Sequence, residues 1–179
     1  MQYPKYQYFP STSPPPAFAS KLAGVFSKHR AAIDTVELRK GLTSNDVLAK
    51  VRPDLVELGF SVEASKLDVD KLQRPVYFGL QGDPTLRYQI DAYQPEWRCG
   101  LEIEAGRAWM GNAVYRDLIQ AMVMVDVDIL TLAVPIAYKF NNAGKQTISN
   151  DFENTRAVVS AVYGHSRVRI PYSLLLIGY

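Results

Sequence analysis

Two apolar segments joined by a short polar turn constrain the fold of this chain more than any other feature. Residues 87–93 and 97–104 have the length and composition of β-strands, and Gln94-Pro95-Glu96 between them is typical of a turn. The two segments therefore predict a β-hairpin within a domain that contains at least one sheet.

Three acidic side chains lie on this predicted hairpin. Asp91 comes at the end of one apolar run, while Glu102 and Glu104 alternate with Leu101 and Ile103 on the next. Residues two apart on a strand face the same side, so Glu102 and Glu104 share a face. Carboxylates held close together repel one another unless a proton or a cation intervenes, and Mg²⁺ prefers oxygen ligands of this kind. The pattern predicts a metal site for phosphodiester hydrolysis with Asp91 and Glu102 as first ligands; the alternative is a set of solvated acids at a strand end.

The arrangement of these acids resembles the PD-(D/E)xK nuclease superfamily. Ile90-Asp91 stands at the place of the "PD" pair, and Glu102-Ile103-Glu104 stands at the place of "(D/E)xK". Glu104 thus replaces the usual Lys, as Glu does in restriction endonucleases of the BamHI type.

The segments that follow the motif extend the resemblance. Residues 106–108 and 112–117 are similar to the corresponding part of uncharacterised bacterial proteins of this superfamily, and the order of elements matches over roughly residues 44–179. The resemblance implies an α/β fold with a restriction endonuclease-like α-β-β-β-α-β core, in which helices flank a mixed central sheet. It also implies a Mg²⁺-dependent endonuclease acting on DNA, with Mn²⁺ able to substitute and with a homodimer as the acting form.

The resemblance assigns roles to further residues. The backbone carbonyl of Ile103 would be a third metal ligand, and Glu104 would orient or deprotonate the attacking water. Related nucleases often supply another acid from the helix before the first strand, which here is Glu57; a solvent-facing Glu57 is the alternative. Glu63 is a second candidate on the first strand, where a solvated side chain is the simpler interpretation.

Basic and polar side chains near the motif are candidates for contacts with nucleic-acid phosphates. Arg107 follows the second strand, and Tyr115 and Arg116 belong to the helix after it. Asn112 and Arg116 are one helical turn apart and therefore share a face of that helix. The alternative role of Asn112 is to cap the helix, and that of Arg116 is to pair with a carboxylate. A second basic group surrounds the strand before the hairpin: Lys66, Lys71, Arg74 and Arg87.

Composition limits the class of protein. With 179 residues, 47% of them hydrophobic, the chain suits one domain, which we place at residues 17–179 after a Pro- and Tyr-rich extended arm at residues 1–16. A net charge of +2 means that nucleic-acid binding would need a local basic patch. Cys99 is the single cysteine, and no apolar run approaches the ~20 residues that span a bilayer. We therefore expect a cytoplasmic protein without a membrane partner.

Hydrophobic periodicity predicts the remaining elements. Thr43-Ser44 is typical of a helix N-cap, whereas Pro53 removes one backbone hydrogen bond from the helix that follows and is expected to kink it. The predicted helices cover residues 17–33, 44–58, 112–125 and 152–162; the predicted strands cover 60–65, 76–80, 129–138 and 174–177, with a loop at 141–145.

Two other functions remain open from the sequence. The missing Lys favours a non-catalytic member of the same fold that binds nucleic acid or protein, whereas the retained acids oppose it. A third possibility is an unrelated α/β protein that binds a small molecule, in which Asp91 and Glu102 would not converge.

Overall fold

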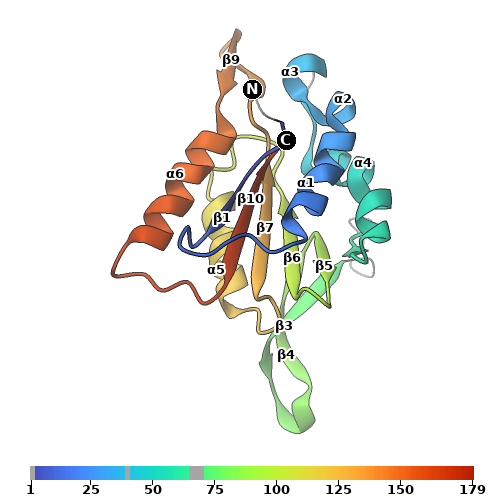
Figure 1. Cartoon of the computed structure of the whole chain (residues 1–179), viewed down its shortest axis with the longest axis vertical. Helices are drawn as coiled ribbons and strands as arrows, with labels where there is room; N and C mark the ends of the chain where they lie inside the picture. Colours follow the sequence, from blue (N-terminus) through green and yellow to red (C-terminus); the bar gives the residue numbers. More distant parts are fainter. Residues whose placement is uncertain (1–2, 39–40, 65–70) are drawn as a thin grey trace.

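A mixed β-sheet of six strands forms the centre of the molecule, with helices on both faces, as the computed structural model in Figure 1 shows. The structure describes residues 3–38, 41–64 and 71–179. In the order in which they lie side by side, the strands are β1 (Lys5–Phe9), β10 (Ser173–Gly178), β7 (Ile129–Val134), β6 (Cys99–Ile103), β5 (Ala92–Gln94) and β2 (Ser61–Val62). Strands β10, β7 and β6 run parallel, and the other neighbours pair antiparallel. The predicted mixed α/β fold with a helix-flanked sheet is confirmed.

Two strand pairs lie outside this sheet. They are β3 (Leu72–Phe78) with β4 (Pro84–Ile90), and β8 (Tyr138–Asn142) with β9 (Lys145–Ser149). The helices are α1 (Ala19–Lys28), α2 (Arg30–Ile33), α3 (Thr35–Leu38), α4 (Ser44–Glu57), α5 (Ala113–Val123) and α6 (Asp151–Gly164).

Side-chain alternation along the central strands divides the core into two layers. On one face, the strands pack against α1 and α4 through residues that include Phe26, Leu55, Leu101, Ile103 and Leu175. On the other face, α5 and α6 cover a second cluster that includes Leu118, Leu132, Phe152, Val159 and Leu174. Successive residues of a strand point to opposite faces, so β7 and β10 each contribute to both layers.

Helix α4 begins and ends where its sequence predicts. Thr43 and Asp46 form a capping box, in which the Asp46 amide donates to Thr43 Oγ1 at 3.2 Å and the Thr43 amide donates to Asp46 Oδ2 at 2.8 Å. Pro53 lies inside the helix, which nevertheless continues to Glu57. Gly59 follows with φ +83°, a left-handed conformation that glycine adopts without a steric penalty.

Three sequence predictions about the strands are wrong in detail. Residues 87–93 do not form one strand, because the chain bends at Asp91: β4 before the bend pairs with β3, and only β5 after it pairs with β6. The strand predicted at 129–138 ends at Val134, before Pro135, which has no amide hydrogen to donate to a sheet. The loop predicted at 141–145 belongs to the β8–β9 hairpin.

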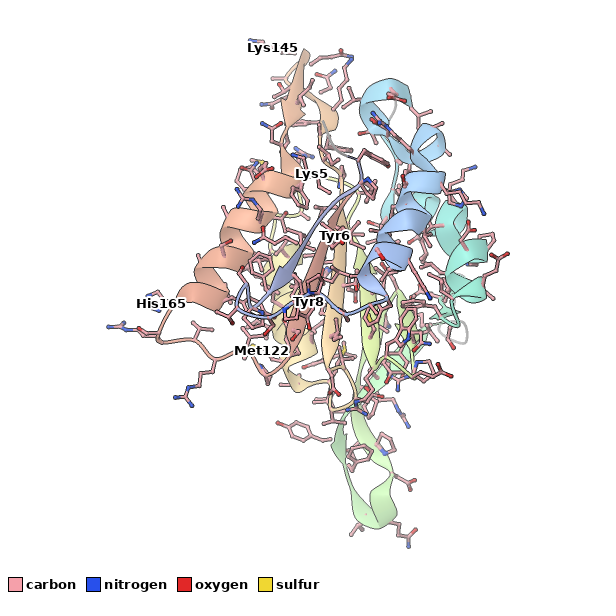
Figure 2. The ribbon with its side chains drawn as sticks, viewed as in Figure 1. Lys5, Tyr6, Tyr8, Met122, Lys145 and His165 are labelled. Atoms are coloured by element: carbon pink, nitrogen blue, oxygen red, sulfur yellow. The ribbon has the colours of Figure 1, made fainter. Side chains whose placement is uncertain are left out.

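The N-terminal arm contributes to the sheet. Its residues Lys5 to Phe9 form β1 and pair with β10 at one edge, and Figure 2 shows Lys5, Tyr6 and Tyr8 along this strand. Part of the segment predicted as an extended arm is therefore an edge strand of the domain.

None of the helices in the described segments is long and apolar enough to cross a bilayer.

Candidate active site

Strand β6 places an acidic side chain where the adjacent strand β7 places a leucine. Leu101 and Ile103 belong to the core beneath α1 and α4, so the residue between them, Glu102, points to the face that α5 covers. Glu102 lies in register with Leu132 of β7, which packs on the α5 side. A carboxylate thus stands under a helix at a position where the adjacent strand has an apolar residue.

Helix α5 brings a second acid to the same place. Its buried side chains are Val114, Asp117, Leu118 and Ala121, so Asp117 belongs to the inward face and is only 2% exposed. Arg116 donates from Nε to Asp117 Oδ1 at 2.9 Å. Asp117 Oδ2 is buried, and no described residue lies within hydrogen-bond geometry of it. Glu104 is nevertheless close enough to lower the pKa of Asp117 by hydrogen bonding, so a proton held by Glu104 compensates part of the Asp117 charge.

Asp91 reaches this place from the bend between β4 and β5. Its Oδ2 accepts a hydrogen bond from the Ile103 amide at 2.8 Å, and its carbonyl accepts one from the Glu63 amide at 2.8 Å. These two contacts link the end of β2, the bend and β6. Asp91 and Glu102, which the sequence predicts as neighbours, do converge, and Glu63 joins them.

The acids surround a polar cavity of about 470 Å³ between α5 and β4. Hydrophobic contacts hold the base of the β3–β4 hairpin beside it, where Leu72 and Tyr88 pack on Ile90 and Tyr93. The cavity is lined by Glu63, Arg87, Tyr88, Gln89, Ile90, Asp91, Glu102, Arg116, Asp117 and Gln120.

Burial and mutual repulsion raise the pKa values of the acids around the cavity. Burial raises the pKa of Asp91 to about 6. The hydrogen bond from the Ile103 amide lowers this pKa, and the charges of Glu63 and Asp117 raise it further. Burial also raises the pKa of Glu102 well above its usual range, and the charges of Asp91, Asp117 and Glu104 add to this effect. The carboxylates therefore hold protons more tightly than free side chains do.

Glu104 lies next to this group although it does not line the cavity. Burial and the charge of Asp117 raise its pKa to about 8, while Arg116 opposes the shift by donating from Nη2 to Glu104 Oε1 at 3.2 Å. Burial raises the pKa of Asp117, and the charge of Arg116 opposes this shift. Burial also raises the pKa of Glu63. Arg116 thus bonds two acids of the cluster, which confirms the alternative in which its side chain pairs with a carboxylate.

The chemistry of these groups fits a hard divalent cation. The side chains offer carboxylate oxygens, and the charges of neighbouring acids help to raise the pKa values of Asp91 and Glu102. Within residues 3–38, 41–64 and 71–179, no three His, Cys, Asp or Glu side chains are already arranged to hold an ion together.

Several predicted site residues lie away from the cavity. Glu57 is exposed near the end of α4, and Tyr115 points to solvent with 48% of its surface exposed. The Arg107 guanidinium lies 4.6 Å from the centre of the Phe140 ring on β8, and its amide donates to Asp151. Asn112 occupies the N-cap of α5 without a side-chain capping hydrogen bond.

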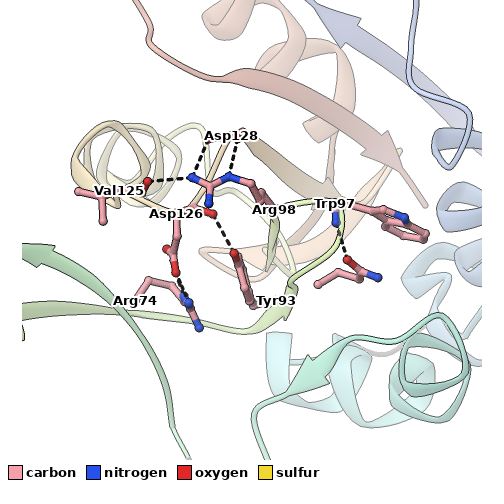
Figure 3. Close-up of polar contacts among 8 residues, drawn as sticks. Arg74, Tyr93, Trp97, Arg98, Val125, Asp126 and Asp128 are labelled. Atoms are coloured by element: carbon pink, nitrogen blue, oxygen red, sulfur yellow. Dashed lines mark hydrogen bonds and ion pairs between the residues drawn. The ribbon is translucent and has the colours of Figure 1, made fainter.

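The predicted basic group before the hairpin is divided. Arg74 bonds the carboxylate of Asp126 and lies 3.8 Å from the Tyr93 ring centre, an arrangement that Figure 3 shows together with the bond from Tyr93 to the Asp126 carbonyl. Arg87 lines the cavity. Lys71 does not line it, and Lys66 lies outside the described residues.

Sequence reasoning missed part of the site. Glu63 follows β2 rather than lying within it, lines the cavity and has a pKa raised by burial, so it is closer to the site than its interpretation as a solvated strand residue implies. Asp117 and Gln120 also line the cavity, and the sequence analysis assigns neither to the site. The signal for Asp117 was present, because an acid at i+3 between Val114 and Leu118 falls on the apolar stripe of the helix.

Compared with protein-family models, with curated proteins and with solved structures, this chain matches none.

Proposed function

We propose that this protein is a metal-dependent nuclease that hydrolyses phosphodiester bonds, most simply in DNA, at the cavity between α5 and β4. The observation that carries the proposal is the convergence of Asp91, Glu102 and Asp117, from three different elements, on one polar cavity. Acids gathered in this way outnumber the cations bonded to them, here Arg116, and are unfavourable unless protons or a metal ion balance the remaining charge.

The order of the elements supports a restriction endonuclease-like core. Helix α4, strands β2, β5 and β6, helix α5 and strand β7 follow one another as α-β-β-β-α-β, with the β3–β4 hairpin inserted after β2. Strands β5 and β6 form the antiparallel pair that carries the acids, and α5 connects β6 to the parallel strand β7.

In this proposal the residues of the chain have distinct roles. Asp91, Glu102 and Asp117 would hold Mg²⁺ or Mn²⁺, together with the Ile103 carbonyl that the superfamily resemblance implies. The bound ion would supply a water of lowered pKa and neutralise charge on the leaving oxygen. Glu104, which lies beside Asp117, would accept or return a proton next to the ion. Arg116 would position Glu104 and Asp117 through the bonds that it makes to both.

The test combines metal binding and cleavage. We would titrate Mn²⁺ calorimetrically into wild type, Glu102→Gln and Glu57→Gln, with and without duplex DNA, and follow plasmid nicking by the same samples. We expect Glu102→Gln to lose metal binding and to nick about 100-fold more slowly or worse, since a direct ligand should matter at least as much as an outer-shell partner. Glu57→Gln is the matched control, because Glu57 carries the same group on an exposed position. Wild type that binds no Mn²⁺ even with DNA present would sink the metal site.

A non-catalytic binding module is the second candidate. The observation that favours it is Arg116, whose guanidinium bonds both Glu104 and Asp117 and so supplies part of the missing charge from within the protein. Metal-independent binding of nucleic acid by wild type, without nicking, would support this function instead.

A further inference from the structure

The β3–β4 hairpin is an insertion that leaves the body of the protein. Figure 1 shows it extending away from the central sheet, beyond the ends of β5 and β6. Its base is anchored by Leu72 and Tyr88, which pack against the small cluster around Ile90 and Met124. Its far end has no such packing.

Apolar side chains at the far end are exposed. Tyr77 is 62% exposed, Phe78 is 54% exposed and Leu80, in the connecting turn, is 92% exposed. Isolated exposed apolar residues are ordinary, but a group of them on one projecting element marks an interaction site. The connecting turn itself is compact, with Gln81 and Gly82 at positive φ.

The hairpin is continuous with the candidate active site. Arg87, Tyr88 and Gln89 of β4 line the cavity, so one wall of the cavity is the hairpin itself. A polymer that enters the cavity must therefore run beside β4 on one side of the scissile bond.

Arg87 differs from the other basic residue of the hairpin. Arg74 is bound to Asp126 and stacked on Tyr93. Among the described residues, no hydrogen bond, ion pair or ring contact engages the Arg87 side chain. An unengaged guanidinium of a cavity-lining residue is suited to a phosphate group.

We propose that the β3–β4 hairpin binds a single-stranded segment of nucleic acid, with Tyr77 and Phe78 stacking on unpaired bases and Arg87 contacting a phosphate at the cavity. This inference rests on the proposed function of the cavity. Exposed aromatic rings stack on bases whose faces are open, as in single strands. A duplex hides those faces and presents two charged backbones. The basic residues of β3 and β4 are Arg74 and Arg87, and Arg74 is already bound to Asp126. The hairpin therefore offers little free positive charge to a duplex.

The test measures binding without added metal ion. The probe is a fluorescein-labelled single-stranded DNA oligonucleotide, alone or annealed to its complement, and the readout is fluorescence anisotropy in EDTA. The proteins are wild type, the double variant Tyr77→Ser/Phe78→Ser, and Arg87→Gln. The control is Ile148→Ser, because Ile148 is also 54% exposed and lies on the β8–β9 hairpin, which Figure 2 marks with Lys145 at the opposite end of the molecule.

We expect wild type to prefer the single strand and the double variant to lose about tenfold or more in affinity for it. Arg87→Gln should bind less tightly, and the slope of log K against log salt should fall by roughly 0.7, the share of one phosphate contact. Ile148→Ser should bind as wild type does. Circular dichroism spectra and thermal unfolding of each variant establish that exposed substitutions leave the fold intact.

Three results would overturn the inference: unchanged binding by the double variant, tighter binding of the duplex, or no binding of either probe by wild type. Light scattering identifies a further contrary outcome, in which the double variant changes only the association of two copies of the chain. The two proposals fail separately. If the double variant binds metal, nicks DNA and keeps its DNA affinity, the hairpin proposal fails and the nuclease proposal stands. If DNA binding depends on the hairpin but no metal site is found, the nuclease proposal fails and the role of the hairpin in binding stands.

Discussion

Asp54 and Asp117 are both buried acids on helices that pack against the central sheet, yet their surroundings are opposite. Asp54 on α4 accepts bonds from Lys28 and from His29, and the bond from Lys28 is the first cause that lowers its pKa. Asp117 on α5 has a raised pKa, with burial as the first cause and Arg116 as the cation that opposes it.

The difference shows that burial of an acid does not by itself identify a functional group. Asp54 joins α4 to the end of α1 and is balanced by the protein's own cations. Around Asp117, Glu104 shares the Arg116 guanidinium, and the same positive charge acts on the buried Glu102. A structural acid is balanced from within, whereas the acids at the cavity lack balance until a proton or a cation arrives.

The largest effect is expected from metal binding, which should raise the free energy of unfolding through the acids at the cavity and not through Asp54. Mn²⁺ at a hundred times its Kd should stabilise wild type by about 2.7 kcal/mol, because it binds the folded chain only. The measurement is thermal unfolding with and without Mn²⁺. Glu102→Gln should lose the shift and Asp54→Asn should retain it; a shift retained by Glu102→Gln would place the ion elsewhere.

Asp91→Asn should stabilise the metal-free protein at neutral and alkaline pH. A folded pKa of about 6, against 3.8 for a free side chain, means that the folded state binds more protons between these values, so stability falls as pH rises through this window. Removing the ionisable group should recover on the order of 2 kcal/mol above pH ~6 and nothing below pH ~4.

Urea unfolding in EDTA at an acidic and an alkaline pH measures this difference. Glu96→Asn is a suitable control, because Glu96 is an exposed acid of the neighbouring turn. Loss of stability in Asp91→Asn at alkaline pH would mean that the carboxylate is balanced within the protein, as Asp54 is.

Arg116→Gln should lower the free energy of unfolding, by less than Asp91→Asn raises it. Loss of the guanidinium leaves Asp117 and Glu104 without their cation, which should destabilise the protein by about 1–2 kcal/mol at neutral pH, reduced because Arg116 is itself 56% exposed. Chemical denaturation at pH 7 measures the loss. Arg156→Gln, which removes an exposed pair with Glu153, should change stability little by comparison.

The smallest effect is expected for Lys28→Gln. Lys28 lowers the pKa of Asp54, so the contact stabilises the fold above the unfolded pKa of that acid and the benefit is lost as pH falls through the folded value. Unfolding curves of wild type and variant should therefore differ slightly at pH 7 and converge in acid. A difference that grows in acid would show that Lys28 acts through something other than Asp54.

Much of the local structure could be predicted because it depends on residues close in sequence. The capping box of Thr43 and Asp46, the apolar spacing of α5 and the alternation around Glu102 are all visible within a few positions. The bend at Asp91 was not visible, because the pairing of β4 with β3 is decided by contacts with other segments.

The same division applies to the candidate site. Sequence alone determined that Glu102 and Glu104 share a face and that Asp91 precedes them on a neighbouring segment, since strand geometry fixes the direction of each side chain. Only the tertiary structure decided that Asp117 and Glu63 join them and that Glu57 and Arg107 do not. The reason is physical. The pKa of a carboxylate depends on its burial and on its distance from charges on other elements, and both are fixed only after α5, β4 and β6 have packed together.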